Sequence, residues 1–255
     1  MRLALLSWPE VRDYLQSRKT ILLPIGSHEQ HGPTGLIGTD ALCAEAIAWE
    51  AGRRSTTVVG PTIGIGMAHY HLGFPGSISL RPTTLLAMIL DVVGSLRLHG
   101  FAHIVFVNAH GGNCSTVRTA FDELHAATSF DDKDATSPLR CSLVNWWEGP
   151  RVRQVQEDLY GDNEGLHAVA SEISLTYWLH PEAAKQAVLV PPVAPTGPVL
   201  DAPDYRRRFP DGRIGSDPSP ACAEHGRRFL EAAAADLVET IERQERAFAK
   251  EQLAG

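Results

Sequence analysis

The sequence predicts an α/β fold, a three-layer α/β/α sandwich with a mostly parallel central sheet, formed as a single domain over residues 1–255. Two observations predict this architecture. Strand patterns alternate with amphipathic helix patterns from about residue 20 to residue 180. The segments at 20–25 and 103–108 are nearly continuous apolar runs, which is typical of parallel strands covered on both faces.

The first half of the chain alternates helices and strands as this fold requires. A helix begins after Ser7, because Pro9 suits a first helical turn and Glu10 stands three residues after the cap. The next expected elements are a strand at 20–25, a helix at 41–53, a strand at 57–59, a loop at 60–80 and a helix from Arg81 that Gly100 ends.

The second half continues the alternation. Its expected elements are a strand at 103–108, a helix at 114–126, a solvated loop at 128–138, a strand at 140–146 and helices at about 150–159, 168–179 and 221–250. The proline-rich stretch at 190–220 shows no helix or strand pattern. Loops of this length in compact domains are usually functional or form interfaces.

Composition excludes several classes of protein. With 44% hydrophobic and 21% charged residues, the chain has an ordinary globular composition, and its net charge of −7 argues against nucleic acid as a partner. No run approaches the roughly 18 apolar residues of a membrane span, and the N-terminus lacks the apolar core of a signal peptide. The four cysteines form no Cys-x-x-Cys pair. We therefore expect a cytoplasmic protein with reduced thiols.

Three segments carry side chains suited to chemistry. The first is Gly26–His31, directly after the strand at 20–25, together with Asp40. The second is Asn108–Asn113, at the end of the strand at 103–108, and the third is Glu164–His167 with Glu172 five residues beyond it. Because parallel strands deliver their C-terminal loops to one edge of the sheet, the first two segments should meet in space.

These segments contain enough ligands for two divalent cations. Asp40 could bridge the ions, with Glu29 and His110 completing one site and His31 and Glu172 the other. Each ion would then have about three protein ligands and an open position for water, as in catalytic sites. Oxygen and nitrogen donors suit zinc, manganese and iron, of which we expect zinc first. A water shared by two cations becomes a strong nucleophile near neutral pH.

Further side chains are candidates for catalysis and substrate binding. His167, if it binds no metal, could give a proton to the leaving nitrogen, and Glu172 could act as an acid or base instead of a ligand. We expect three residues to contact substrate: His71, Asn113 and Trp147. Trp147 would do so by stacking on a flat molecule.

Each segment also has a purely structural interpretation. Glu29–His31 could form a capped turn or a salt bridge, and Asp40 could be only the N-cap of its helix. The glycines after His110 could serve a tight turn that places this histidine in the core. The three candidate substrate contacts also have structural alternatives. His71 could serve only its loop, Asn113 could close its turn, and Trp147 could pack in the core. The joint occurrence of the three segments favours a metal site.

The motifs in this order resemble the creatininase family of metal-dependent amidohydrolases. The segments that carry the resemblance together are highly specific and span roughly residues 20–180. They are residues 23–33, 38–40, 74–80, 99–101 and 107–113, and then His167 with Glu172 and Ser174.

The resemblance implies a three-layer α/β fold, a binuclear metal site and a hexamer built as a trimer of dimers. It also implies hydrolysis of an amide or a cyclic amide-like C–N bond. By position, the residues that match the family's ligands are Glu29, His31, Asp40 and His110, with Asp40 bridging. His167 matches a histidine that handles protons in the family.

The chain departs from the family's pattern at two positions. Gly112 stands where creatininase itself has a glutamate ligand, so the second ion needs another donor, for which we choose Glu172. Ala170 stands where many relatives have an acid, which argues against creatinine as the substrate. Because the family also includes deformylase-like and peptide-cleaving members, the resemblance does not fix the substrate.

The sequence thus predicts a hydrolase that acts on a C–N bond of a small-molecule amide with two divalent cations. The alternative is a metal-binding, non-hydrolytic or peptide-processing subunit of a biosynthetic pathway, and His167 argues against a non-hydrolytic role. A metallophosphatase is disfavoured because no cationic cluster lies beside the ligand motifs to bind a phosphate.

Overall fold

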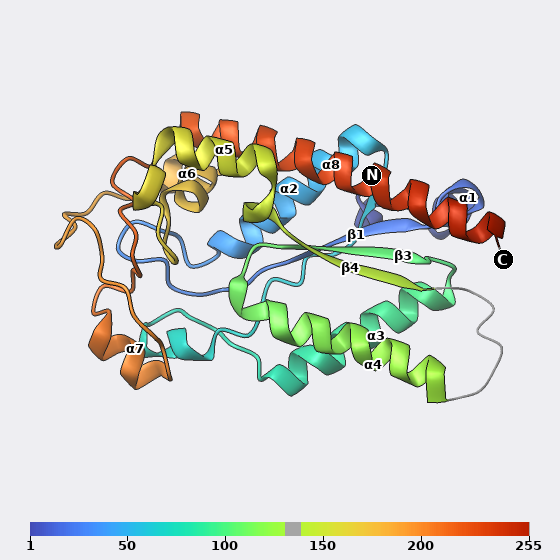
Figure 1. Ribbon diagram of the computed structural model, residues 1–255, viewed down its shortest axis with the longest axis horizontal. Coiled ribbons are helices and arrows are strands. Elements are labelled where there is room, and N and C mark those ends of the chain that lie inside the picture. Colours follow the sequence, from blue (N-terminus) through green and yellow to red (C-terminus); the bar gives the residue numbers. More distant parts are fainter. Residues whose placement is uncertain (131–138, 255) are drawn as a thin grey trace.

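The computed structural model describes residues 1–130 and 139–254, and it confirms the three-layer α/β sandwich (Figure 1). Within these residues the central sheet has four strands, all parallel, in the order β2-β1-β3-β4. The strands are β1 at Thr20–Ile25, β2 at Val58–Val59, β3 at His103–Asn108 and β4 at Arg140–Asn145. Ile25 pairs with Asn108 and Asn108 with Asn145, so three strands end at one level.

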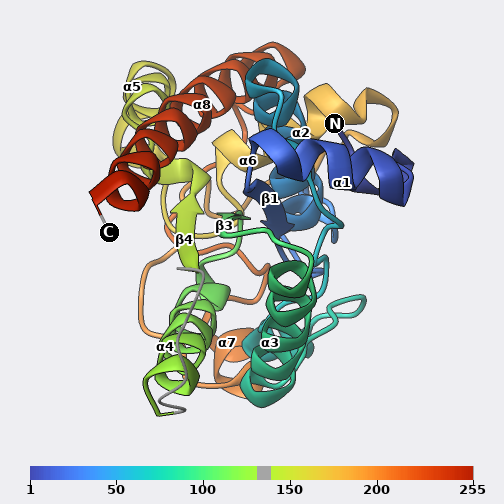
Figure 2. The same ribbon diagram turned by 90° about the vertical axis from the view of Figure 1, so that its right-hand side faces the viewer.

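Helices cover both faces of the sheet, as the end-on view shows (Figure 2). One layer contains α2 (Thr39–Ser55), α5 (Pro150–Leu159), α6 (Ala170–Leu179) and α8 (Ala223–Ala254). The other contains α3 (Pro82–Leu98) and α4 (Cys114–Phe130), and α1 (Trp8–Ser17) packs into the same core cluster. No helix in the described ranges is long and apolar enough to cross a membrane.

Strands β1 and β3 are apolar over most of their length because both of their faces are covered. Side chains alternate along a strand, so Leu22 and Val105 pack with α2 and α8, while Leu23 and Phe106 pack with α3 and α4. All six residues of β1 and of β3 are buried. This two-sided burial fixes the strand ends, and with them the loops that carry the polar motifs.

Several predicted boundaries differ from the structure by one to four residues, among them the ends of α4 and β4. Helix α4 continues to Phe130, past its predicted end at residue 126, and the rest of the predicted solvated loop, 131–138, lies outside the described residues. Strand β4 ends at Asn145, and Trp146 begins a short 3₁₀ helix instead of finishing the strand.

The prediction that residues 190–220 contain no helix is wrong, because α7 spans Ala202–Arg208. Asp201 caps this helix by accepting a hydrogen bond from the Asp204 backbone N–H at 2.8 Å. The helix is stabilised by Tyr205, which packs in a small apolar cluster with Phe74 from a distant loop. That contact is tertiary, and a short helix among prolines gives no periodic pattern by which to find it.

Candidate metal centre

The predicted ligands come together at the C-terminal edge of the sheet. Two groups of side chains each place three ligand atoms within 4.8 Å of one another: Glu29, Asp40 and His110 form the first, and His31, Asp40 and Glu172 the second. Asp40 belongs to both groups, as a carboxylate between two cations must. The loop after β1, the start of α2, the loop after β3 and the start of α6 supply these residues.

The two oxygens of Asp40 face different halves of the centre. Oδ1 lies 3.0 Å from His31 Nε2, and Oδ2 lies 3.3 Å from His110 Nδ1. Glu29 Oε1 lies 3.3 Å from the same His110 nitrogen, and Glu172 Oε2 lies 3.7 Å from His31 Nε2. These distances place Asp40 between Glu29 and His110 on one side and His31 and Glu172 on the other.

Backbone carbonyls fix the orientation of the two candidate ligand histidines. His31 Nδ1 lies 3.1 Å from the Glu29 carbonyl oxygen, and His110 Nε2 lies 3.1 Å from the Met67 carbonyl oxygen. Because a carbonyl can only accept, the ring nitrogen facing it carries a proton and donates. The opposite nitrogen of each ring then faces the carboxylates, which is how metal-binding histidines are usually held.

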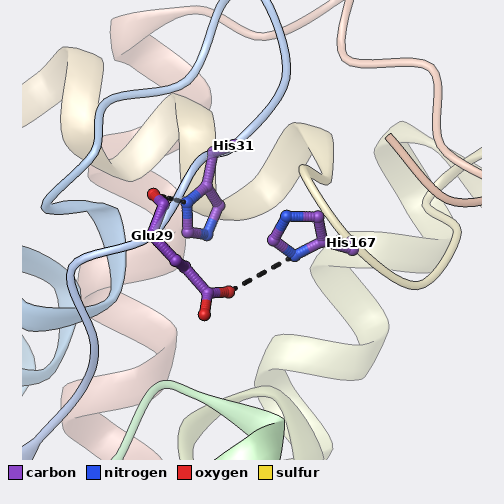
Figure 3. A group of neighbouring side chains, drawn as sticks. All are labelled: Glu29, His31 and His167. Atoms are coloured by element: carbon purple, nitrogen blue, oxygen red, sulfur yellow. Dashed lines mark hydrogen bonds and ion pairs between the residues drawn. The ribbon is translucent and has the colours of Figure 1, made fainter. Parts of the chain in front are cut away.

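His167 lies beside Glu29 and His31, with its ring turned towards the Glu29 carboxylate (Figure 3). Its Nε2 donates to the Gln30 carbonyl oxygen at 2.8 Å, and its Nδ1 lies 3.6 Å from Glu29 Oε1. Glu29, His31 and His167 form a third group whose ligand atoms lie within 4.8 Å of one another. His167 is thus placed either to bind a cation or to exchange a proton beside it.

Buried atoms of the centre lack hydrogen-bond partners among the described residues. They are both carboxylate oxygens of Glu29, Oδ2 of Asp40 and Nε2 of His31. Leaving a buried polar atom unpaired costs roughly 1–3 kcal/mol, so several such atoms around one point favour a bound group that satisfies them. Carboxylate oxygens and imidazole nitrogens are ligands of zinc, manganese and iron, and the residues therefore fit divalent cations.

The helix that carries Asp40 excludes the capping alternative. Helix α2 begins at Thr39 with Gly38 at the N-cap, so Asp40 already lies within the first turn and its side chain faces the centre. Glu172 has a mixed role, because its Oε1 accepts the Val169 backbone N–H at 2.8 Å at the start of α6 while Oε2 faces His31. This geometry favours a ligand role for Glu172 over an acid–base role.

The ionisable groups of the centre compensate one another. Burial lowers the pKa of His31, but Asp40 and Glu172 more than reverse this, and the pKa is about 10. Burial also disfavours the cationic form of His110, yet Glu29 and Asp40 raise its pKa well above the ordinary value. Burial raises the pKa of Glu172 to about 7. Protons on the two imidazoles therefore sit where cations would bind.

Metal binding is consequently expected to release protons, with an affinity that rises from pH 7 towards the pKa of His31, about 10. The affinity rises with pH because a cation needs the unprotonated Nε2 of His31, and raising the pH removes the competing proton. Titration calorimetry with Zn²⁺ or Mn²⁺ in buffers of different ionisation enthalpy measures the release. An affinity independent of pH over this range would contradict the assignment of His31 as a ligand.

The expected substrate-contacting residues occupy different positions around a cleft of about 260 Å³ beside the centre. Trp147 lines the cleft, whereas neither His71 nor Asn113 is among the described residues that line it. Asn113 is fully buried, donates to the Gly26 carbonyl oxygen at 3.0 Å and accepts from the Met67 backbone N–H at 3.0 Å. This placement favours its alternative role of closing the turn.

His71 lies beside the candidate ligand Glu29, with its Nε2 3.4 Å from Glu29 Oε1. Gln30, which sequence reasoning did not single out, lies 3.0 Å from His71 Nδ1 and donates to the Gly212 carbonyl oxygen at 2.9 Å. Its position between Glu29 and His31 was the only sequence signal for this role. Gln30 ties the ligand loop to the segment after α7, and Tyr205 donates to the same carbonyl at 2.7 Å.

Comparison with known proteins finds relatives that are similar in sequence. Mycofactocin precursor peptide peptidases of two mycobacteria are similar: that of Mycolicibacterium smegmatis is 35% identical over 121 residues, 45% of this chain and 47% of that protein. That of Mycobacterium tuberculosis is 28% identical over 235 residues, 88% of this chain and 85% of that protein. The creatinine amidohydrolase of Pseudomonas putida is 25% identical over 251 residues, 92% of this chain and 94% of that protein.

The fold also matches solved structures. A manganese form of creatininase superposes with a TM-score of 0.83 at 24% identity and covers 95% of this chain and 98% of its own. The family model for creatininase, described as creatinine amidohydrolase, matches residues 4–241. With nearly the whole chain matched by that model, the chain belongs to the creatininase family of hydrolases.

Proposed function

We propose that this protein is an amidohydrolase that holds two divalent cations and hydrolyses a C–N bond of a small amide or cyclic amide. The observation that carries the proposal is the position of Asp40 between two buried ligand groups, one with Glu29 and His110 and the other with His31 and Glu172. Zinc is the first expectation, and manganese or iron would suit the same donors.

When bound, such cations lower the pKa of a coordinated water and polarise a carbonyl group. His167 would carry the proton transfer at Nδ1, because its Nε2–H is committed to the Gln30 carbonyl oxygen. Burial, together with the nearby His31, lowers the pKa of His167 to about 3, so the ring is neutral at pH 7. A neutral Nδ1 can accept a proton and return it to the leaving nitrogen.

His167→Gln is expected to lower kcat by about 10²-fold with little change in KM, because the variant loses a proton carrier and keeps the cations. Steady-state kinetics and metal analysis by mass spectrometry measure both effects. The control is His180→Gln, which changes a histidine whose side chain is 41% exposed and should leave kcat unchanged. Loss of one ion per chain in His167→Gln would make His167 a ligand instead.

The size of the cleft bears on the substrate. A volume of about 260 Å³ lies at the lower end for small-molecule pockets, which favours a small amide. A second candidate is hydrolysis at the end of a peptide, supported by the similarity over 88% of the chain to a mycofactocin precursor peptide peptidase. In that case only the terminal residues of the peptide would enter the cleft.

A panel of substrates tests the proposal. Metal-loaded protein is incubated with linear amides, cyclic amides including creatinine, and short peptides, and amine release is followed by chromatography with mass detection. Turnover of small amides supports the first candidate, and turnover of peptides alone supports the second. A protein that binds two ions and turns over nothing would favour the non-hydrolytic alternative. The hexamer stays a prediction, which light scattering would test.

A further inference from the structure

A carboxylate outside the three candidate metal groups lies in the wall of the same cleft. Glu164 lines the cleft together with Trp147 and Glu172, and its Oε2 is buried without a hydrogen-bond partner among the described residues. The three groups of side chains that could hold a metal do not include it. Its unpaired oxygen therefore needs an explanation other than a cation of the centre.

The other oxygen of Glu164 is fully committed. Glu164 Oε1 accepts hydrogen bonds from the Ser171 hydroxyl and from Gln156 Nε2, the latter at 3.3 Å. Ser171 belongs to α6 and Gln156 to α5, so two separate helices hold the carboxylate. The orientation that satisfies Oε1 leaves Oε2 free.

The backbone around Glu164 is held equally firmly. Gly165 has φ +81°, and a Cβ at this position would lie 2.4 Å from the backbone of Gly215, so only glycine fits. The Leu166 N–H donates to the Ile214 carbonyl oxygen at 2.9 Å, immediately after this glycine. A carboxylate fixed in this way binds a partner without losing side-chain freedom.

The surroundings favour a positively charged partner. An unpaired carboxylate oxygen is satisfied best by an N–H that carries charge. Within the described part of the chain, no lysine or arginine lines the cleft, and no side chain there donates a hydrogen bond to Glu164 Oε2. Burial raises the pKa of Glu164, and the hydrogen bonds from Ser171 and Gln156 oppose this shift. The indole of Trp147, on the same cleft wall, can also contact the face of a cationic group.

The position of Glu164 relates it to the candidate metal centre. Ser171, which holds its carboxylate, directly precedes Glu172 at the start of α6. Glu164 also lines the same cleft as Glu29 and Glu172, so a group bound at Glu164 Oε2 would share this cleft with the candidate metal ligands.

We propose that Glu164 anchors the substrate, with Oε2 accepting a hydrogen bond from a protonated nitrogen of the ammonium or amidinium type. This inference rests on the proposed function and narrows its substrate class to small amides that carry a cationic nitrogen beside the scissile bond. Glu164 is in this view a binding residue that selects the substrate and does not take part in proton transfer.

Equilibrium binding tests the anchor without requiring turnover. Methylguanidinium and its neutral analogue N-methylurea are titrated into metal-loaded protein, with tryptophan fluorescence as the readout. The wild type is expected to bind the cation at least about 10-fold more tightly than the urea. Glu164→Gln preserves the size of the side chain and should abolish this preference, and Glu164→Asp should weaken it.

The matched control is Glu157→Gln, which removes the same charge from an exposed residue of α5 next to Gln156 and should retain the preference. Circular dichroism and metal content verify that each variant is folded and loaded. An equal preference in Glu164→Gln and the wild type, or none in the wild type, would overturn the anchor. If the protein hydrolyses amides but does not prefer the cation over the urea, the proposed function stands without the anchor. If it prefers the cation but hydrolyses no amide, Glu164 would be a cation-binding residue of a non-hydrolytic protein.

Discussion

Replacing Asp40 with alanine is expected to remove both cations from the protein and to lower amide hydrolysis by about 10³-fold or more. The physical reason is that the two oxygens of this carboxylate face separate halves of the centre, His31 at 3.0 Å and His110 at 3.3 Å. No other described residue belongs to both of these ligand groups. Metal content by inductively coupled plasma mass spectrometry and the initial rate of hydrolysis measure the two effects together.

Single-site variants make this expectation sharper. His110→Ala removes a ligand from the group with Glu29, and Glu172→Ala removes one from the group with His31, so each should lose one ion and keep the other. The matched control for Asp40→Ala is Glu45→Ala, which removes an exposed acid from the same helix and should keep both ions. Two ions per chain in Asp40→Ala would refute the shared-ligand arrangement.

The parts of the fold that sequence could predict are those that burial dictates locally. Strands β1 and β3 are apolar on both faces because helices cover both, and this leaves a continuous run in the sequence. Helix α7 could not be predicted, since it depends on Tyr205 packing with Phe74, far away along the chain. The end of α4 at Phe130 could not be predicted either, because the sequence carries no signal for the end of a helix there.

The candidate site likewise has a part that the sequence predicts and a part that it does not. Glu29, His31, Asp40 and His110 follow strand ends, and parallel strands bring such residues together whatever lies between them. The free oxygen of Glu164 could not be foreseen, because it results from hydrogen bonds that Ser171 and Gln156 make from two other helices. Residue type and spacing identify side chains that can bind a ligand, whereas the partners that orient them come from the packing.

Arg213→Ala is expected to destabilise the protein by about 1–3 kcal/mol, because it removes the hydrogen bonds of a buried charged side chain. The Arg213 side chain is fully buried and forms an ion pair with Asp211 at 2.8 Å. Its guanidinium also donates to the carbonyl oxygens of Pro191 at 2.7 Å, Pro192 at 2.6 Å and Ser216 at 3.1 Å. One residue thus joins both ends of the long segment between α6 and α8.

The same segment supports the candidate site. Gly212, next to Arg213, accepts hydrogen bonds from Gln30 and Tyr205, and Ile214 forms a bridge with His167. The Arg213 stem also packs against Gly32, where a Cβ would lie 2.7 Å from Arg213 Cγ, so the glycine of the ligand loop is needed for this contact. Loss of Arg213 should therefore loosen His167 as well as the segment.

Urea denaturation followed by circular dichroism measures the change in stability, and the midpoint should fall while the slope stays constant. Arg207→Ala is the matched control, because this arginine lies on α7 with a side chain that is 71% exposed and pairs with Asp204. Asp204 keeps its ion pair with Arg208 at 2.8 Å in this variant, so the control should stay within about 1 kcal/mol of the wild type. If Arg213→Ala unfolded at the wild-type urea concentration, the buried arginine would not be what fixes this segment.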